Sequence, residues 1–190
     1  MSSKTTTQYA NVVEKCKDIF FKKFQDYGSS WRMLRITSVT DQVFIKAQRI
    51  RSIEQKGESK IDEGILPEFM GIINYSIIAL IQLELDDVVI NEEVVEGDQL
   101  SIDEVTSYYK KHADYAQSLM MSKNHDYNEA WRDMRISSFT DLILTKLMRI
   151  KQIEDNKGET IVSEGIDSNY YDIINYAIFA LIQLEEKGEN

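Results

Sequence analysis

Apolar residues recur along most of the chain at the three- and four-residue spacing of an amphipathic α-helix, and strictly alternating segments are almost absent. The first half of the chain shows three such stretches, at about 8–25, 38–54 and 67–85. In the second half, the first stretch covers about 102–124 and the third begins near residue 168. Eight glycines and one proline leave few points at which helices would break. We therefore predict an all-α protein.

The three-helix pattern is present twice. Three segments of the first half return in the second half: 26–36 (DYGSSWRMLRI) as 126–136 (DYNEAWRDMRI), 41–54 as 141–154, and 72–84 as 173–185 after one inserted residue. Between residues 26 and 84, 31 of 59 positions are identical to their counterparts. Similar composition alone does not produce agreement of this extent, so the pattern indicates a tandem duplication.

The duplication defines the organisation of the chain. We assign residues 1–85 to a first helical repeat, 86–101 to an acidic connector and 102–190 to a second helical repeat. A unit of this size is near the lower limit for an independent core. We therefore expect the two three-helix units to pack on one another as a pseudo-twofold bundle within one compact domain.

The second helix of each repeat has cations on its apolar side. We expect this helix to begin near Ser38, which with Asp41 resembles a capping box, and to end at Gly57. In projection, Lys46 and Arg49 lie on the same arc as the isoleucines that must face neighbouring helices. The second repeat has Lys146 and Arg149 at the equivalent positions. A charge on an inward arc requires an anion, from the protein or from a ligand.

The third helix of the second repeat carries the matching polar groups. It is apolar around nearly its whole circumference, except for Asp172, Asn175, Tyr176 and Gln183 on one side. Glu164 would join this side if the helix extended back to it. Two interpretations follow: the cations and acids form a buried ion pair between helices, or they form a metal and phosphate site. The sequence leaves both open.

Charge and composition exclude several classes of function. There are 22 Lys and Arg residues against 32 Asp and Glu residues, so the net charge of −10 argues against binding a nucleic acid duplex. No uninterrupted apolar run is long enough to suggest a membrane span, and the polar start lacks an apolar signal stretch, so we expect a cytoplasmic protein. Cys16 is the single cysteine, and we expect it to be buried. Glycine-rich phosphate loops, zinc-ligand spacings and nucleophile elbows are absent from the sequence.

Three motifs together resemble a known family. They are the turn Asp26-Tyr27-Gly28, the Asp…Lys-x-x-Arg helix (Asp41, Lys46, Arg49; Asp141, Lys146, Arg149), and the Glu…Asp-x-x-Asn-Tyr helix (Glu164, Asp172, Asn175, Tyr176). Their combination resembles the tandem helical proteins called nucleotide modification associated domains, over both repeats. That domain is in turn similar in pattern to MazG-like all-α nucleoside triphosphate pyrophosphohydrolases, which hold Mg²⁺ between acidic helices.

The resemblance implies Mg²⁺-dependent hydrolysis of a nucleoside triphosphate, including a modified one, to the monophosphate and pyrophosphate. The acids expected to hold Mg²⁺ are Glu164, Asp172 and Asp141. The cations expected to neutralise the phosphates are Lys146, Arg149, Lys46 and Arg49. The side chains expected to contact the nucleotide are Asn175, Tyr176 and Trp131, with Trp31 as a second candidate for the base.

The alternative is a non-catalytic helical module that binds a nucleotide or another protein, with the charged seam serving packing. Tryptophans at such positions are more often core or interface residues than stacking platforms. Gly71 stands where the second repeat has Asp172, so the first repeat is either degenerate or shares the work of the second. The identity of the nucleotide and a further homodimerisation are left open.

Overall fold

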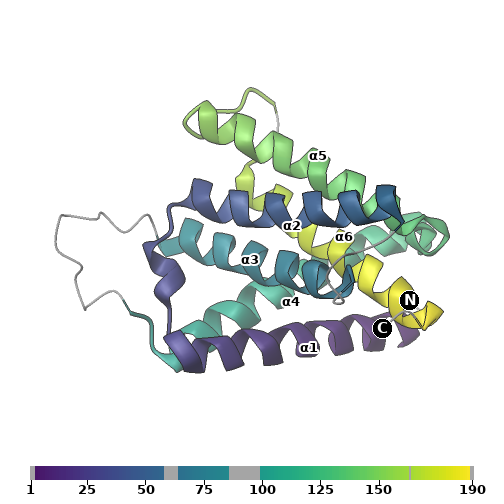
Figure 1. Ribbon diagram of the computed structural model, residues 1–190, viewed down its shortest axis with the longest axis horizontal. Coiled ribbons are helices and arrows are strands. Elements are labelled where there is room, and N and C mark those ends of the chain that lie inside the picture. Colours follow the sequence, from purple (N-terminus) through teal and green to yellow (C-terminus); the bar gives the residue numbers. More distant parts are fainter. Residues whose placement is uncertain (1–2, 58–63, 86–98, 163, 189–190) are drawn as a thin grey trace.

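The structure, a computed structural model, describes residues 3–57, 64–85, 99–162 and 164–188. All regular secondary structure in this part of the chain is helical (Figure 1). The six α-helices in it are α1 (Ser3–Tyr27), α2 (Ile36–Lys56), α3 (Leu66–Leu85), α4 (Ile102–Tyr127), α5 (Ile136–Asp155) and α6 (Ile166–Lys187). Two short 3-10 helices, η1 (Ser30–Met33) and η3 (Ala130–Asp133), follow α1 and α4. The all-α prediction is confirmed. Most of the predicted connector, residues 86–98, lies outside the described residues.

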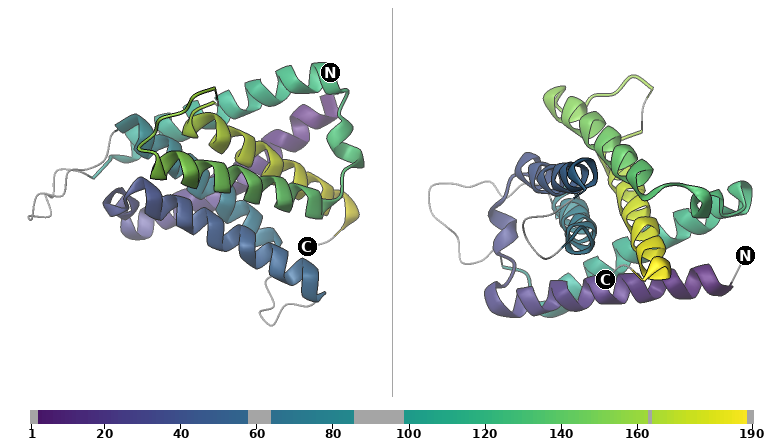
Figure 2. Two further views of the ribbon diagram at one scale, coloured as in Figure 1. Left: turned by 90° about the horizontal axis from the view of Figure 1, so that it is seen from above. Right: turned by 45° about the vertical axis from the view of Figure 1, so that its right-hand side comes forward.

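The two repeats form one bundle with pseudo-twofold symmetry. The pair α2 and α3 packs against the pair α5 and α6, with α3 against α6 and α2 against α5. The first helices, α1 and α4, lie outside this group of four, and each contacts both α3 and α6 (Figure 2). Each repeat therefore completes its core with the third helix of the other repeat.

Buried hydrogen bonds repeat this symmetry in atomic detail. Tyr9 Oη donates to Asn175 Oδ1 at 2.8 Å, and its counterpart Tyr109 donates to Asn74 Oδ1 at 3.0 Å. Each asparagine then donates its amide to a backbone carbonyl in the first helix of its own repeat. Buried polar groups left without partners would cost free energy, so these bonds fix how the two repeats are docked.

The contact between α2 and α5 is also reciprocal. Thr40 Oγ1 donates to Glu154 Oε1 at 2.5 Å, and Thr140 Oγ1 donates to Glu54 Oε1 at 2.9 Å.

The predicted capping box at Ser38 is wrong, because α2 begins earlier with Arg35 as N-cap and without a side-chain cap. Helix α2 ends as predicted at Gly57, whose φ of 70° lies in the left-handed region that glycine adopts without strain.

Helices α3 and α6 form the centre of the core. Most of their residues are buried, in agreement with apolar side chains on nearly all sides. By length and composition alone α3 could cross a membrane, although the sequence has no uninterrupted apolar run of that length. However, 67% of that stretch is buried inside the protein, so packing against other helices accounts for its apolar character.

A buried histidine lies where α4 meets α3 and α6. His112 is 4% exposed; its Nδ1 lies 2.8 Å from Tyr171 Oη, and its Nε2 lies 3.2 Å from Glu84 Oε2. Lys111 Nζ donates to the other oxygen of Glu84 at 2.5 Å. Burial lowers the pKa of His112, although the nearby carboxylate of Glu84 opposes this effect. The ring is therefore neutral at neutral pH.

We predict an acid-sensitive contribution of His112 to stability. Because its pKa is lower in the folded protein, the unfolded chain binds more protons here, and stability is lost as the pH falls below about 6.5, the unperturbed histidine pKa. His112→Val introduces the residue that Val12 provides at the equivalent position of the first repeat. In urea unfolding between pH 8 and pH 5.5, the wild type should lose stability relative to this variant on acidification. Parallel curves would contradict the prediction.

Candidate functional site

The inward-facing lysine of the second repeat is paired with an acid. Lys146 Nζ lies 2.6 Å from Asp172 Oδ2, and Lys123 Nζ on α4 donates to Asp172 Oδ1 at 2.5 Å. Asp172 is 8% exposed, and burial alone would raise its pKa. Hydrogen bonds from the two lysines outweigh burial and hold the pKa of Asp172 below its usual value, so the carboxylate stays charged.

The first repeat pairs its cations with a different acid. Lys46 Nζ lies 3.3 Å from Glu68 Oε2, and Arg49 Nη1 donates to Glu68 Oε1. Glu68 is one helical turn before Gly71, the position that corresponds to Asp172. Lys46 runs across Gly71: a Cβ atom built there would lie 2.8 Å from Lys46 Cδ and Cε. The glycine therefore leaves the space through which Lys46 reaches Glu68.

The acids expected to hold Mg²⁺ are not brought together. Asp141 lies at the contact of α5 with α2, 4.0 Å from Arg51 Nε, and Glu164 is exposed. Each carboxylate oxygen of Asp172 is bound by a lysine. Within the described ranges, no group of three or more His, Cys, Asp or Glu side chains is placed to hold a metal ion. These side chains, as arranged, do not fit a Mg²⁺ ion.

Two side chains expected to contact the nucleotide are instead committed to packing. Asn175 is 5% exposed and makes the hydrogen bonds between repeats described above. Trp131 is 5% exposed and stacks flat on Phe179, with ring centroids 4.3 Å apart. Tyr176 is half-buried beside Asp172. The inward position expected for Arg149 is wrong, because its side chain is exposed, and it has no ion pair to any described side chain. The predicted nucleotide contacts of Asn175 and Trp131 thus lack free surface.

A cavity that combines several aromatic side chains with two lysines lies in the first repeat, for which the sequence leaves open a degenerate or a contributing role. Its volume is about 490 Å³, and its lining comes from α1, η1, α2 and α3. Five aromatic side chains line it: Phe20, Phe24, Tyr27, Trp31 and Tyr75. We call this cavity the aromatic pocket. It has the size and the mixed apolar and charged lining typical of small-molecule sites.

Three substitutions distinguish the aromatic pocket from the equivalent region of the second repeat. Gly71 replaces the carboxylate that fills the second repeat, and Ile78 replaces the Phe179 ring that covers Trp131. Phe24 adds an aromatic wall where the second repeat has Asn124. The exchange of Asp172 for Gly71 is therefore the sequence feature that indicates the pocket. It allows two interpretations, because a glycine at this position both removes a carboxylate and leaves open space.

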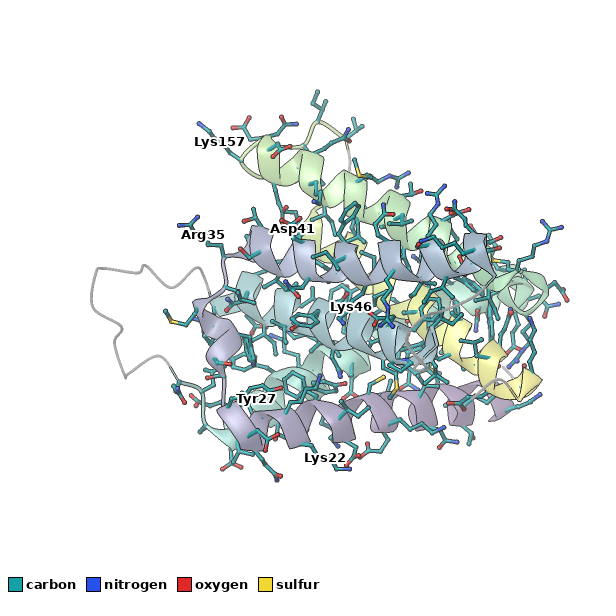
Figure 3. The ribbon with its side chains drawn as sticks, in the orientation of Figure 1. Lys22, Tyr27, Arg35, Asp41, Lys46 and Lys157 are labelled. Carbon is teal, nitrogen blue, oxygen red and sulfur yellow. The ribbon has the colours of Figure 1, made fainter. Side chains whose placement is uncertain are left out.

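Charged side chains of the aromatic pocket are unevenly paired. Lys23 and Lys46 both line it; Lys23 is exposed and has no ion pair with the described residues, whereas Lys46 contacts Glu68. Figure 3 shows Lys46 reaching from α2 toward α3, with Tyr27 at the end of α1. Lys46 Nζ also lies 5.8 Å from the ring centroid of Tyr75. The net result is a positive, aromatic cavity on an acidic protein.

The turn that carries Trp31 is held by a buried glutamine. Gln82 Nε2 donates to the carbonyl of Leu34 at 2.7 Å and to that of Arg32 at 3.3 Å. Gln183 makes the equivalent bonds to the backbone around η3 in the second repeat. Gln183, part of the predicted polar seam, therefore has a structural role that its counterpart Gln82 shares. This bonding fixes η1 against α3 and sets the position of the Trp31 ring at the pocket.

Comparison with known proteins gives a match to one family. The family described as nucleotide modification associated domain 1 matches residues 23–83 and 123–184, which together form most of the chain. The first matched segment contains the described lining of the aromatic pocket apart from Ile19 and Phe20. No curated protein and no solved structure matches the chain. The comparisons do not support the similarity to MazG-like enzymes.

We predict that Asp172→Asn destabilises the fold. Lys146, with 13% of its side chain exposed, would lose its anionic partner, and we expect a loss of about 1–3 kcal/mol in the free energy of unfolding. Because the pKa of Asp172 is lower in the folded protein, this difference should shrink as the pH falls below about 4, where the carboxylate of the unfolded chain protonates before that of the folded protein. Urea unfolding of both proteins measures it.

The matched control is Asp41→Asn. Asp41 pairs with Lys151 at 2.5 Å, but its side chain is 57% exposed, so this variant should lose less than about 1 kcal/mol. Equal losses in the two variants would show that burial of Asp172 does not strengthen its role.

Proposed function

Because the chain belongs to the nucleotide modification associated domain 1 family, we propose that it binds a nucleotide, and that the aromatic pocket of the first repeat is the binding site. In this proposal the base lies among the aromatic rings and the phosphate faces the lysines. The observation that carries it is the presence of five aromatic side chains and two lysines in one cavity.

The aromatic side chains suit a nucleobase. Every base has a flat π-face, and stacking on an aromatic side chain contributes about 1–3 kcal/mol per base. Trp31 and Tyr75 are half-buried and Tyr27 is 55% exposed. Unlike the aromatic rings of the core, these three rings are therefore accessible to a ligand. In contrast, Trp131 is already stacked on Phe179. The first repeat therefore offers the better platform.

The lysines suit the anionic part of a nucleotide. Within an overall charge of −10, Lys23 and Lys46 form a local positive region at the pocket. The negative charge of Glu68 is offset by Arg49, which binds it. An anion that enters the pocket thus meets two lysines whose charge is not fully compensated.

Mg²⁺-dependent release of pyrophosphate from a nucleoside triphosphate stays a separate prediction. It would require the metal to compete with Lys123 and Lys146 for Asp172, because both of its oxygens are bound by these lysines. Incubation with a panel of nucleoside triphosphates and Mg²⁺ measures it. Pyrophosphate release that a chelator abolishes would support hydrolysis, and binding without turnover would support the binding module.

We predict that Trp31→Leu weakens nucleotide binding about tenfold or more, because a stacking contact of the base is lost. Isothermal titration calorimetry with a panel of nucleotides measures the affinity. The matched control is Trp131→Phe, which keeps an aromatic ring against Phe179 and should leave the affinity unchanged. If Trp31→Leu leaves the nucleotide affinity unchanged, or if Trp131→Phe lowers it equally, the base does not stack on Trp31.

A further inference from the structure

The second repeat shows where an anion lies between the two equivalent lysines. There the carboxylate of Asp172 accepts from Lys123 at 2.5 Å and contacts Lys146 at 2.6 Å. The first repeat has Lys23 and Lys46 at the same positions, both lining the aromatic pocket, and Gly71 in place of Asp172. The first repeat therefore keeps the two cations and lacks an acid at the position of Asp172, while its own acid, Glu68, contacts Lys46 from one helical turn earlier.

We propose that one phosphate monoester lies between Lys23 and Lys46, over Gly71, and that the ligand of the aromatic pocket is a nucleoside monophosphate. This inference rests on the proposed function and adds the position of the phosphate and the class of nucleotide. In structural terms, the ligand phosphate takes the place that the side chain of Asp172 takes in the second repeat.

Lys46 is free to turn toward such a phosphate. Its contact with Glu68 is 3.3 Å, longer than the 2.6 Å contact between Lys146 and Asp172. Arg49 also binds Glu68, so this acid keeps a partner when Lys46 moves. The backbone at Gly71 carries no side chain, and Lys46 is what lies against it. Movement of one flexible side chain therefore exposes the phosphate position.

The charge of the pocket matches one monophosphate. Arg49 offsets Glu68, which leaves the two positive charges of Lys23 and Lys46 for a dianion. A triphosphate carries more negative charge and usually requires Mg²⁺ to bind beside a protein. Among the residues that the structure describes, no cluster of acids is arranged to hold that metal. The aromatic walls occupy the rest of the lining and suit the base.

The first experiment compares ligands on the full chain by isothermal titration calorimetry. For one base, the probes are the nucleoside, its 5′-monophosphate and its 5′-triphosphate, the last with and without Mg²⁺. We expect the monophosphate to bind at least about tenfold more tightly than the nucleoside, because charge-assisted hydrogen bonds to lysine are gained. The triphosphate should bind no more tightly than the monophosphate. Inorganic phosphate should compete with the monophosphate but not with the nucleoside.

The second experiment installs the missing acid. Gly71→Asp places in the first repeat the carboxylate that Asp172 provides in the second, so monophosphate affinity should fall to that of the nucleoside, while nucleoside affinity stays unchanged. Gln48→Asp is the matched control, because it adds the same charge at an exposed position of α2 outside the lining of the aromatic pocket, and it should leave monophosphate affinity unchanged. Lys23→Ala provides a second test at an exposed residue where misfolding is not expected, and it should lower only the phosphate-dependent part of the affinity.

Each outcome separates the two proposals. If the nucleoside binds as tightly as the monophosphate, or if Gly71→Asp and Lys23→Ala leave the monophosphate affinity unchanged, the phosphate position is wrong while nucleotide binding stands. If the triphosphate binds most tightly, the class of nucleotide is wrong. If no nucleoside or nucleotide binds, the proposed function fails and this inference fails with it.

Discussion

A lysine that faces the interior of a helical bundle needs an anion, and this requirement shapes both halves of the protein. Lys46 and Lys146 occupy equivalent positions on α2 and α5, but they meet acids that differ by one helical turn, Glu68 and Asp172. The cost of an unpaired charge is high in a partly buried environment, so each repeat has kept a partner while changing where that partner sits. The position of the acid then decides whether the neighbouring space is filled or open.

As a consequence, the two repeats share the same helix packing but differ in the surroundings of their equivalent lysines. Reciprocal hydrogen bonds and helix contacts relate the repeats closely throughout the core, whereas the surroundings of the two lysine pairs have diverged. In the second repeat, this region holds the ion pair of Asp172 and the stacked rings of Trp131 and Phe179. In the first repeat, Gly71 and Ile78 leave a cavity with aromatic walls. Symmetry thus supports the fold, and departure from symmetry provides the candidate site.

The sequence was sufficient to predict the helices and their duplication, because both depend on local periodicity and on comparison of the chain with itself. It also placed Lys46 and Lys146 correctly on inward faces. For Lys146 it gave an ion pair with Asp172 as one of two interpretations, and the structure shows that contact. It did not identify Glu68 as the partner of Lys46, because Glu68 has no acidic counterpart in the second repeat. Trp131 has the core role that the sequence analysis gave as the more common one, and not the free face that a nucleotide contact requires, because its stacking on Phe179 depends on the close approach of η3 to α6. The aromatic pocket was missed because a glycine was interpreted as loss of a ligand.

The hydrogen bonds from Tyr9 to Asn175 and from Tyr109 to Asn74 imply a history as well as a docking geometry. Each joins the first helix of one repeat to the third helix of the other, which is the arrangement that two identical subunits would adopt around a dyad. In such an ancestral dimer, every amino-acid exchange would appear in both subunits at once. Two copies within one chain are free of that coupling, so this chain can carry a glycine at position 71 and an acid at the equivalent position 172.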